Sequence, residues 1–205
     1  MIKCWTAGLA VMLAAAAITA SAQEGQPFVN GNLGRANMSG GFQGHGNEGA
    51  TAWAVRFGYA WRDSALSYGL EAGYADFGKT SQNGTYVYLD SQGKQQQAAY
   101  GYSRSIKGWL LGGNLKYDFT SRWYLSARGG WFRSEVTSTS TGFNGERMHG
   151  SYADNRWYAG IGTGYNVSKS WSAGVFYDYF DLGSTRYSQG RNYVGAYSVS
   201  LEYRF

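Results

Sequence analysis

The final stretch of the chain, residues 193–205, alternates strictly between apolar and polar side chains. The odd positions carry Tyr197, Val199, Leu201, Tyr203 and Phe205, and the even positions between them carry Ala196, Ser198, Ser200, Glu202 and Arg204. A period of two residues predicts a β-strand with one apolar face and one polar face. Because the same alternation recurs along most of the chain, the sequence predicts an all-β protein.

Six further segments show this alternation clearly: residues 53–61, 66–74, 109–119, 123–131, 157–167 and 171–179. A first strand over residues 27–38 is less regular, because Phe28 lies out of phase with Val29 and Leu33. Short turns at 63–64, 120–122 and 168–170 separate some strands, and long polar segments at 39–50, 79–102, 134–154 and 181–192 separate the others. We therefore expect about eight antiparallel strands, with short turns at one end and long loops at the other.

Aromatic residues recur eight positions apart on the apolar faces. The pairs are Trp53/Trp61, Trp109/Tyr117, Trp123/Trp131, Trp157/Tyr165, Trp171/Tyr179 and Tyr197/Phe205, whereas the first and third strands lack the pair. Eight steps of about 3.3 Å along a strand tilted by about 40° give roughly 20 Å of height, close to the apolar band of about 25 Å in membrane barrels. Amphipathic rings are stable at both membrane interfaces, so this spacing predicts a transmembrane strand.

Composition agrees with a membrane β-barrel. Aromatic residues make up 18% of the chain, glycine occurs 31 times and proline once, yet the mean hydropathy is −0.41. No long apolar run follows the N-terminal segment, which excludes a helical membrane protein. The sequence thus predicts a transmembrane antiparallel up-and-down β-barrel with short periplasmic turns and long extracellular loops, an apolar outer face and a small, polar inner face.

The N-terminal segment, residues 1–22, has the pattern of a cleaved signal peptide. It combines the positive charge of Lys3, an apolar core over residues 7–17, and the small residues Ala20 and Ala22 at the expected cleavage site. The barrel domain is then expected over residues 23–205. The one cysteine, Cys4, lies within the leader, so the mature chain has neither a disulfide framework nor a thiol nucleophile.

The polar faces of the expected strands carry charged residues among many glycines: Arg56, Glu71, Lys116, Arg128, Asp178 and Glu202. A barrel of about eight strands has an interior just wide enough for side chains. An unpaired charge in that interior would be costly. We therefore expect an interior network of ion pairs and no continuous water channel, while a narrow or gated pore is the alternative use of the same charges.

The sequence predicts no catalytic, cofactor-binding or metal-binding residues. The two histidines, His45 and His149, fall in expected loops without a second metal ligand at a useful spacing. The stretch from His149 to Ser151 weakly resembles the His-x-Ser of PagL-type lipid A deacylases. A hydrolase needs an acid that orients the base, and here Thr163 stands at the position of that acid in the deacylases.

The leader, the strand pattern and the ending at residues 197–205 together resemble the small eight-stranded outer-membrane β-barrels: the OmpA transmembrane domain, the OmpX/Ail group and opacity-type proteins. Residues 71–78 resemble the third strand of the OmpA-like group. The resemblance implies location in a Gram-negative outer membrane, and a final strand that the barrel-insertion machinery reads. We expect that strand to close the barrel on residues 29–33. Because the chain ends at Phe205, the cell-wall tethering of OmpA is not expected here.

Three functions remain open on the sequence. The first is a structural or surface-interaction role, adhesin-like, through the extracellular loops; the second is a narrow pore or carrier for small molecules; the third is a lipid A-modifying enzyme. The expected partners are outer-membrane lipid and lipopolysaccharide, the insertion machinery, and host or extracellular ligands at the loops. The net charge of +5 comes without a basic cluster, so we expect no nucleic-acid partner. A monomer is expected.

Overall fold

The computed structural model describes residues 25–39, 49–89, 92–142, 146–183 and 192–205. In chain order these residues form eight strands: β1 (Gly25–Met38), β2 (Gly49–Asp63), β3 (Leu66–Leu89), β4 (Gln95–Asp118), β5 (Trp123–Thr141), β6 (Arg147–Asn166), β7 (Trp171–Gly183) and β8 (Asn192–Arg204). In this part of the chain, no helix has the length and hydropathy needed to cross a bilayer. The predicted all-β class is confirmed.

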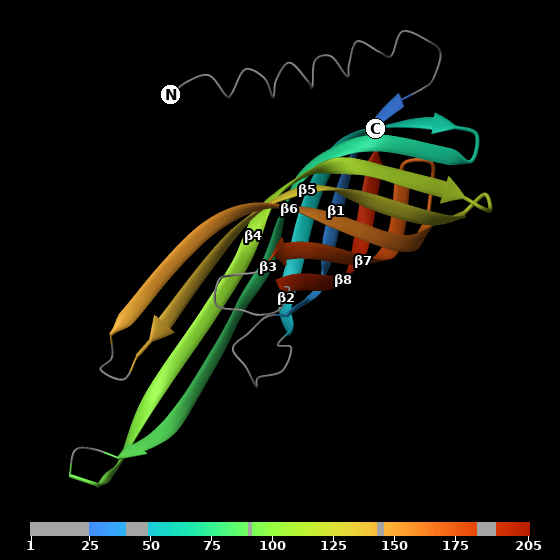
Figure 1. Cartoon of the computed structure of the whole chain (residues 1–205). Coiled ribbons are helices and arrows are strands. Elements are labelled where there is room, and N and C mark those ends of the chain that lie inside the picture. The colour runs from blue at the N-terminus through green and yellow to red at the C-terminus, as the bar shows by residue number, and fades with distance from the viewer. Residues whose placement is uncertain (1–24, 40–48, 90–91, 143–145, 184–191) are drawn as a thin grey trace, which may run out of the picture.

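The sheet closes on itself. Each strand pairs antiparallel with its neighbour in the chain, and β8 returns to pair with β1 (Figure 1). The closing register joins Val29 to Tyr203 and Leu33 to Val199, which confirms the predicted closure on residues 29–33. The C-terminus lies at the periplasmic end with the short turns, while the β3–β4 and β5–β6 hairpins run out at the opposite, extracellular end.

The strand faces are sorted as the alternation predicts. Leu201 on β8 is 52% exposed, whereas the neighbouring Ser200 is 2% exposed and faces the interior. The same contrast separates Leu111, at 48%, from Leu110, at 2%. Large apolar side chains can occupy the outer surface because lipid surrounds it, and the backbone polar groups are satisfied within the closed sheet.

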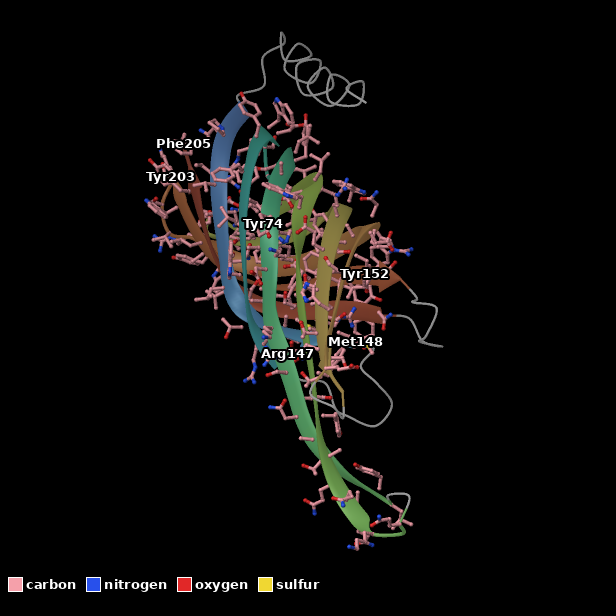
Figure 2. The ribbon with its side chains drawn as sticks, turned by 90° about the vertical axis from the view of Figure 1, so that its left-hand side faces the viewer. Tyr74, Arg147, Met148, Tyr152, Tyr203 and Phe205 are labelled. Atoms are coloured by element: carbon pink, nitrogen blue, oxygen red, sulfur yellow. The ribbon has the colours of Figure 1, made fainter. Side chains whose placement is uncertain are left out.

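Aromatic side chains form a belt toward each end of the apolar outer surface. Toward the extracellular end, the ring centroids of Tyr74 and Trp109 lie 5.1 Å apart. At the periplasmic end, the ring of Tyr203 lies 4.8 Å from Trp171 and 5.0 Å from Phe205. Figure 2 shows Tyr203 and Phe205 near the periplasmic end and Tyr74 farther along β3. The aromatic pairs of the sequence thus face outward at two levels, as the interface argument requires.

Strand β3 joins both belts, although the eight-residue spacing does not detect it. Its two rings, Tyr68 and Tyr74, are six positions apart. Tyr68 stacks on Trp61 of β2 at 6.0 Å, and Tyr74 lies 6.0 Å from Trp53. The third strand thus lacks the eight-residue pair but still places one ring at each interface, through contacts with the tryptophans of β2.

Phe28 is not an irregularity of the first strand. It points into the barrel and is 5% exposed, on the same face as Asn30 and Asn32. The space for its ring comes from Gly58 on the neighbouring β2, where any side chain would collide with that ring. Val29 and its alternating neighbours face outward as usual, so β1 is a regular strand whose inner face begins with an aromatic residue.

Four strands continue past the rest of the barrel. β2 pairs with β3 only as far as Asp76, and β7 pairs with β6 only from Tyr158 toward the periplasmic end. The β3–β4 pairing nevertheless continues to Leu89, and the β5–β6 pairing continues to Arg147. We call the resulting four-stranded sheet, residues 79–89, 95–106, 133–141 and 147–156, the extracellular extension; it leaves one side of the barrel (Figure 1).

The prediction of loops over residues 79–102 and 134–154 is wrong for most of their length. Both faces of the extension are largely polar, so the apolar alternation that reveals a membrane strand is missing there. A β-bulge between Asp76 and Lys79 marks the point where β3 leaves β2. Gly78 sits in this bulge at a φ of 75° and donates its N–H to Asp76 Oδ1 at 2.8 Å, a backbone conformation that favours glycine.

Barrel closure predicts a specific cross-link. Leu33→Cys and Val199→Cys, introduced together in a chain that lacks residues 1–22 and so Cys4, place two thiols opposite each other on β1 and β8. We expect an intramolecular disulfide after oxidation of the folded protein in detergent, seen as faster gel mobility of the heated, non-reduced chain. The control pair Leu33→Cys with Ile161→Cys, on distant strands but equally exposed, should stay reduced. Equal cross-linking of both pairs would contradict the register.

Candidate functional site

The barrel interior is the most elaborate cluster of polar side chains in the described residues. Its strongest contact is a bidentate ion pair between β5 and β7. Arg128 Nε donates to Asp178 Oδ1 at 2.7 Å, and Arg128 Nη2 donates to Asp178 Oδ2 at 2.5 Å. Both side chains are at most 5% exposed. Two parallel charge-assisted hydrogen bonds hold this pair in one geometry across the lumen.

Arg56 on β2 connects this pair to a second carboxylate. Its side chain is 1% exposed, and its Nη1 donates to Asn32 Oδ1 at 2.5 Å. Its Nε lies 3.5 Å from Glu71 Oε1, and its Nη2 lies 3.9 Å from Asp178 Oδ2. Two carboxylates thus flank the buried guanidinium of Arg56, which reduces the cost of taking its charge out of water.

Glu71 is held by neutral donors as well. The hydroxyl of Tyr158 donates to Glu71 Oε1 at 2.8 Å, and the amide of Asn114 donates to Glu71 Oε2 at 3.1 Å. These donors come from β6 and β4, while Glu71 itself lies on β3. The network therefore connects side chains from several strands around the barrel.

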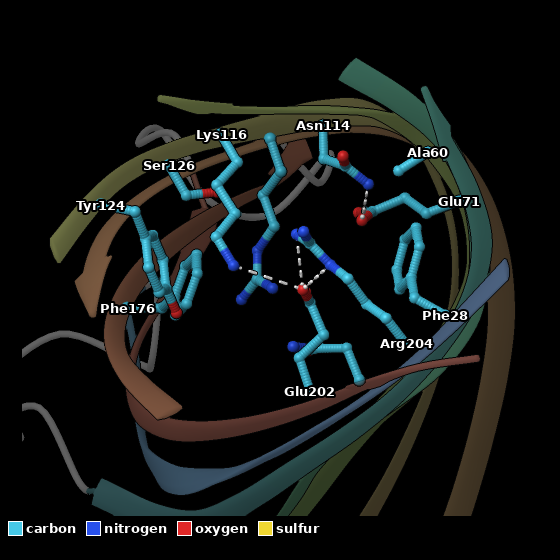
Figure 3. A pocket seen from close by; sticks show the side chains of 12 residues that line it. Phe28, Ala60, Glu71, Asn114, Lys116, Tyr124, Ser126, Phe176, Glu202 and Arg204 are labelled. Carbon is cyan, nitrogen blue, oxygen red and sulfur yellow. Dashed lines mark hydrogen bonds and ion pairs between the residues drawn. The ribbon is translucent and has the colours of Figure 1, made fainter. Parts of the chain in front are cut away.

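A second charged group lies nearer the periplasmic mouth (Figure 3). Lys116 Nζ donates to Ser172 Oγ at 3.0 Å and lies 3.5 Å from Glu202 Oε1. The same oxygen of Glu202 accepts a hydrogen bond from Arg204 Nε at 2.9 Å and lies 2.9 Å from Arg204 Nη2. Lys116 also lies 3.8 Å from the ring centroid of Tyr124. The side chains drawn in Figure 3 leave a cavity of about 20 Å³, the space of roughly one water molecule.

The predicted network of interior ion pairs is confirmed. All six predicted residues take part: Arg56, Glu71, Arg128 and Asp178 in the inner group, and Lys116 and Glu202 at the mouth. The predicted network omits Arg204, which shares Glu202 with Lys116. The sequence signal for Arg204 is that it stands, like Glu202, at an even position of the last strand and so on its polar face.

Above the ion pairs, the extracellular half of the interior contains an apolar layer. Phe77, Phe132 and Phe180 contact one another with ring centroids 4.6 to 5.9 Å apart, and each ring is at most 2% exposed. The ring of Tyr158 stacks on Phe180 at 5.7 Å, so it joins this aromatic layer to Glu71 below. Aliphatic side chains complete the layer: Ile106, Leu110, Val136 and Val194.

Sequence reasoning missed this apolar layer, because it assigned the whole inner face to small and polar residues. A signal was present where apolar residues stand side by side and break the alternation. Leu110 follows Trp109, Phe132 follows Trp131, and Phe180 follows Tyr179. In each case the first residue faces lipid and the second faces the interior.

In the described part of the chain, the residues considered for metal binding or hydrolysis do not come together in one site. His149 is exposed on β6, where its Nδ1 lies 3.3 Å from Thr139 Oγ1. Ser151 pairs with Thr137, and Thr163 instead donates its hydroxyl to the carbonyl of Tyr124 at 2.8 Å. No group of three His, Cys, Asp or Glu side chains there could hold a metal ion. His45 lies outside the described residues.

Because Arg128 and Asp178 are buried together, removing one partner should destabilise the barrel more than replacing both. Arg128→Met leaves Asp178 buried with only the 3.9 Å contact to Arg56, so we expect a loss of about 3–5 kcal/mol in the free energy of unfolding. Arg128→Met combined with Asp178→Asn should recover part of this loss, because no unpaired carboxylate remains. Urea unfolding in lipid vesicles measures the free energy of unfolding of the single and the double variant.

The matched control is Arg62→Met, which removes an ion pair of 2.7 Å to Asp118. The arginine side chain is 53% exposed and Asp118 is 7% exposed, but Asp118 keeps a hydrogen bond from Asn166 Nδ2 at 3.0 Å. The cost of this substitution should stay below about 1 kcal/mol. If Arg128→Met cost no more than Arg62→Met, the interior network would not stabilise the barrel.

The chain is similar to several solved outer-membrane barrels. Neisserial surface protein A is 13% identical with a TM-score of 0.48, covering 87% of this chain and 97% of that one. Ail of Yersinia pestis is 12% identical with a TM-score of 0.49, covering 90% and 100%. The protease OmpT of Escherichia coli is 12% identical with a TM-score of 0.50, covering 91% and 99%. Identities this low concern the fold alone. No curated protein sequence matches the chain.

The family comparison reaches almost the whole sequence. The family model described as the outer membrane protein beta-barrel domain matches residues 7–205, a range that includes every described strand and the interior ion pairs. The chain therefore belongs to the outer membrane protein β-barrel family, whose members lie in the lipid and lipopolysaccharide of the outer membrane.

Proposed function

We propose that this outer-membrane protein is a surface-interaction protein, adhesin-like in role, that presents its extracellular extension outside the cell and conducts no solute. The observation that carries the proposal is the length of the extension. From Tyr74 in the aromatic belt to Leu89, β3 rises by about 50 Å along the strand, or roughly 38 Å in height at a tilt of about 40°. The headgroup layer is only about 5–8 Å deep.

An ordered sheet of that height serves no purpose in anchoring the barrel. Fixing each backbone residue costs about 1–2 kcal/mol of conformational entropy, and a short loop would join β3 to β4 at lower cost. The extension also exposes large apolar side chains near its tip, including Val87 at 56% and Leu89 at 66%. Exposed side chains on an ordered sheet outside the membrane favour contact with a host or extracellular ligand.

The packed interior favours this role over that of a pore. A solute on the barrel axis would meet the buried layer of Phe77, Phe132 and Phe180 and then the paired charges of Arg56 and Arg128. We also propose that the protein is not an enzyme, since His149 contacts a threonine and no described acid orients it.

The remaining parts of the proposal rest on sequence patterns. We propose that residues 1–22 are a signal peptide removed after Ala22, so that residues 23–205 form the mature domain. The alternating segment ending at Phe205 would be read by the barrel-insertion machinery of a Gram-negative cell, and the protein would act as a monomer without a nucleic-acid partner.

Because the lumen is packed, we expect the protein to conduct no ions. Refolded protein in a planar bilayer should give no reproducible single-channel steps. Replacing the apolar layer by Phe77→Ala, Phe132→Ala and Phe180→Ala should still give no large conductance, because the ion-paired layer below remains. Regular steps from the unmodified protein would support the narrow-pore alternative instead.

Shortening the extension predicts loss of surface binding with retention of the barrel. An Asn-Gly turn joining Ser81 to Ser103, and another joining Thr137 to Ser151, remove the outer parts of both hairpins at residues that face each other. Cells producing the unmodified protein should adhere to at least one coat among laminin, fibronectin and heparin, and cells with the shortened form should not. Heat-dependent gel mobility controls for folding. Equal adherence of both cell types would contradict the proposal.

A further inference from the structure

The outward face of the extracellular extension contains a polar groove of about 440 Å³. Its walls carry hydroxyl and amide side chains, and a basic residue stands at each of two opposite corners. The lining groups that matter here are Ser81, Asn83, Ser103, Thr139, Lys79 and Arg147.

The strand register explains why these side chains share one face. Ser81 on β3 pairs with Ser103 on β4, which in turn pairs with Thr139 on β5. The next row lies two residues farther out and runs from Asn83 through Gly101 to the end of β5. Residues two positions apart in a strand point to the same side of the sheet, so two hydroxyl and amide rows lie side by side.

Gly101 forms the floor of the groove. A Cβ atom at this position would lie 3.1 Å from Asn83 Oδ1 and 3.8 Å from Thr141 Oγ1. The missing side chain therefore leaves open the space between two polar side chains. A larger residue at Gly101 would fill the groove without changing its charge.

The charge of the groove selects an anionic ligand. Lys79 and Arg147 line it, and among its described lining residues none is acidic. Neither cation forms an ion pair with a described residue. Hydroxyl groups both donate and accept hydrogen bonds, as sugar hydroxyls do, and free cations favour phosphate or carboxylate.

The spacing of the two cations indicates an extended ligand. Lys79 lies on β3 and Arg147 on β6, three strands apart, which is about 14 Å across the sheet. A single small anion cannot bridge that distance. A chain of sugars that carries more than one negative group can contact both cations and the hydroxyl rows between them.

The height of the groove identifies the source of those sugars. Ser103 lies six residues beyond Trp109 of the extracellular aromatic belt, which is about 20 Å along β4 and roughly 15 Å in height. The headgroup layer ends about 5–8 Å above the hydrocarbon, so lipid phosphates lie too low. The groove is on the face that contacts lipid farther down, and the material beside it at this height is the saccharide of neighbouring lipopolysaccharide.

We propose that this groove binds the anionic core sugars of lipopolysaccharide in the same membrane. Lys79 and Arg147 contact negative groups of the sugar chain, and the rows that include Ser103 and Thr139 contact its hydroxyls. Binding in this groove goes beyond the adhesive role of the extension, because it uses the outward face of the extension and a ligand that comes from the protein's own cell.

The test is a titration of the refolded mature chain in detergent with two probes: lipopolysaccharide with a complete core, and lipid A alone. We expect at least ten-fold tighter binding of the core-bearing form. Lys79→Ala with Arg147→Ala should remove most of that preference, and Gly101→Leu, which keeps all charges, should also reduce it. The control Arg122→Ala with Lys169→Ala removes two cations from the periplasmic turns and should leave the preference intact.

Heat-dependent gel mobility confirms that each variant is folded. Equal affinity of the unmodified protein for both probes would overturn the proposal, as would an unchanged preference in both groove variants. Tight binding of soluble heparin at the groove together with no preference for core-bearing lipopolysaccharide would overturn it in favour of an external anionic glycan. The adhesion of cells with shortened hairpins is scored separately, so either proposal can fail alone.

Discussion

Backbone hydrogen bonding in lipid is the constraint on which this structure depends. Within the bilayer no water is present to satisfy a free N–H or C=O, so a sheet in that environment has to close. The pairing of β1 with β8 supplies the closure. Once the ring is closed, each strand has one face toward lipid and one toward the interior, and the period of two residues assigns every side chain to one of them.

The same closure determines what the interior can be. Eight strands enclose a space that side chains fill, so the interior of this barrel is a core. That core has two kinds of packing. Near the periplasmic mouth, charges such as Arg128 and Asp178 are buried in pairs, and toward the cell exterior rings such as Phe132 and Phe180 contact each other directly. The extension lies in water, where unpaired strand edges are tolerated, and its four strands can therefore leave the ring.

The sequence predicts the parts of the fold that lipid controls. Alternation and aromatic spacing located the strands, the closing pair and the charged residues of the interior, because each of these depends on which face meets lipid. Alternation alone does not explain the ring of Phe28 inside the barrel, because Gly58 on the neighbouring strand leaves the space for it. The fixed aromatic spacing omits Tyr68, which stacks on Trp61 of the neighbouring strand. The sequence predicts loops in place of the extension, because both faces of the extension meet water and neither face is apolar.

The candidate sites were only partly predictable for a related reason. The charged residues could be placed inside from their phase, but the choice of partners on different strands, such as Lys116 on β4 with Glu202 on β8, needs the register between those strands. The groove on the extension combines residues from four strands, and the bulge at Gly78 shifts the phase of β3 before Lys79 enters it. No local pattern in the sequence reports either arrangement.

The most direct test of this account is a scan of spin labels along β4 in lipid vesicles. Single cysteines at each of residues 109–117 carry the label, and collision with oxygen dissolved in the lipid is measured at each position. We predict high accessibility at the odd positions, including Leu111 and Leu115, and low accessibility at the even positions, including Leu110 and Lys116. A profile without this period of two, or one with the even positions facing lipid, would contradict the account.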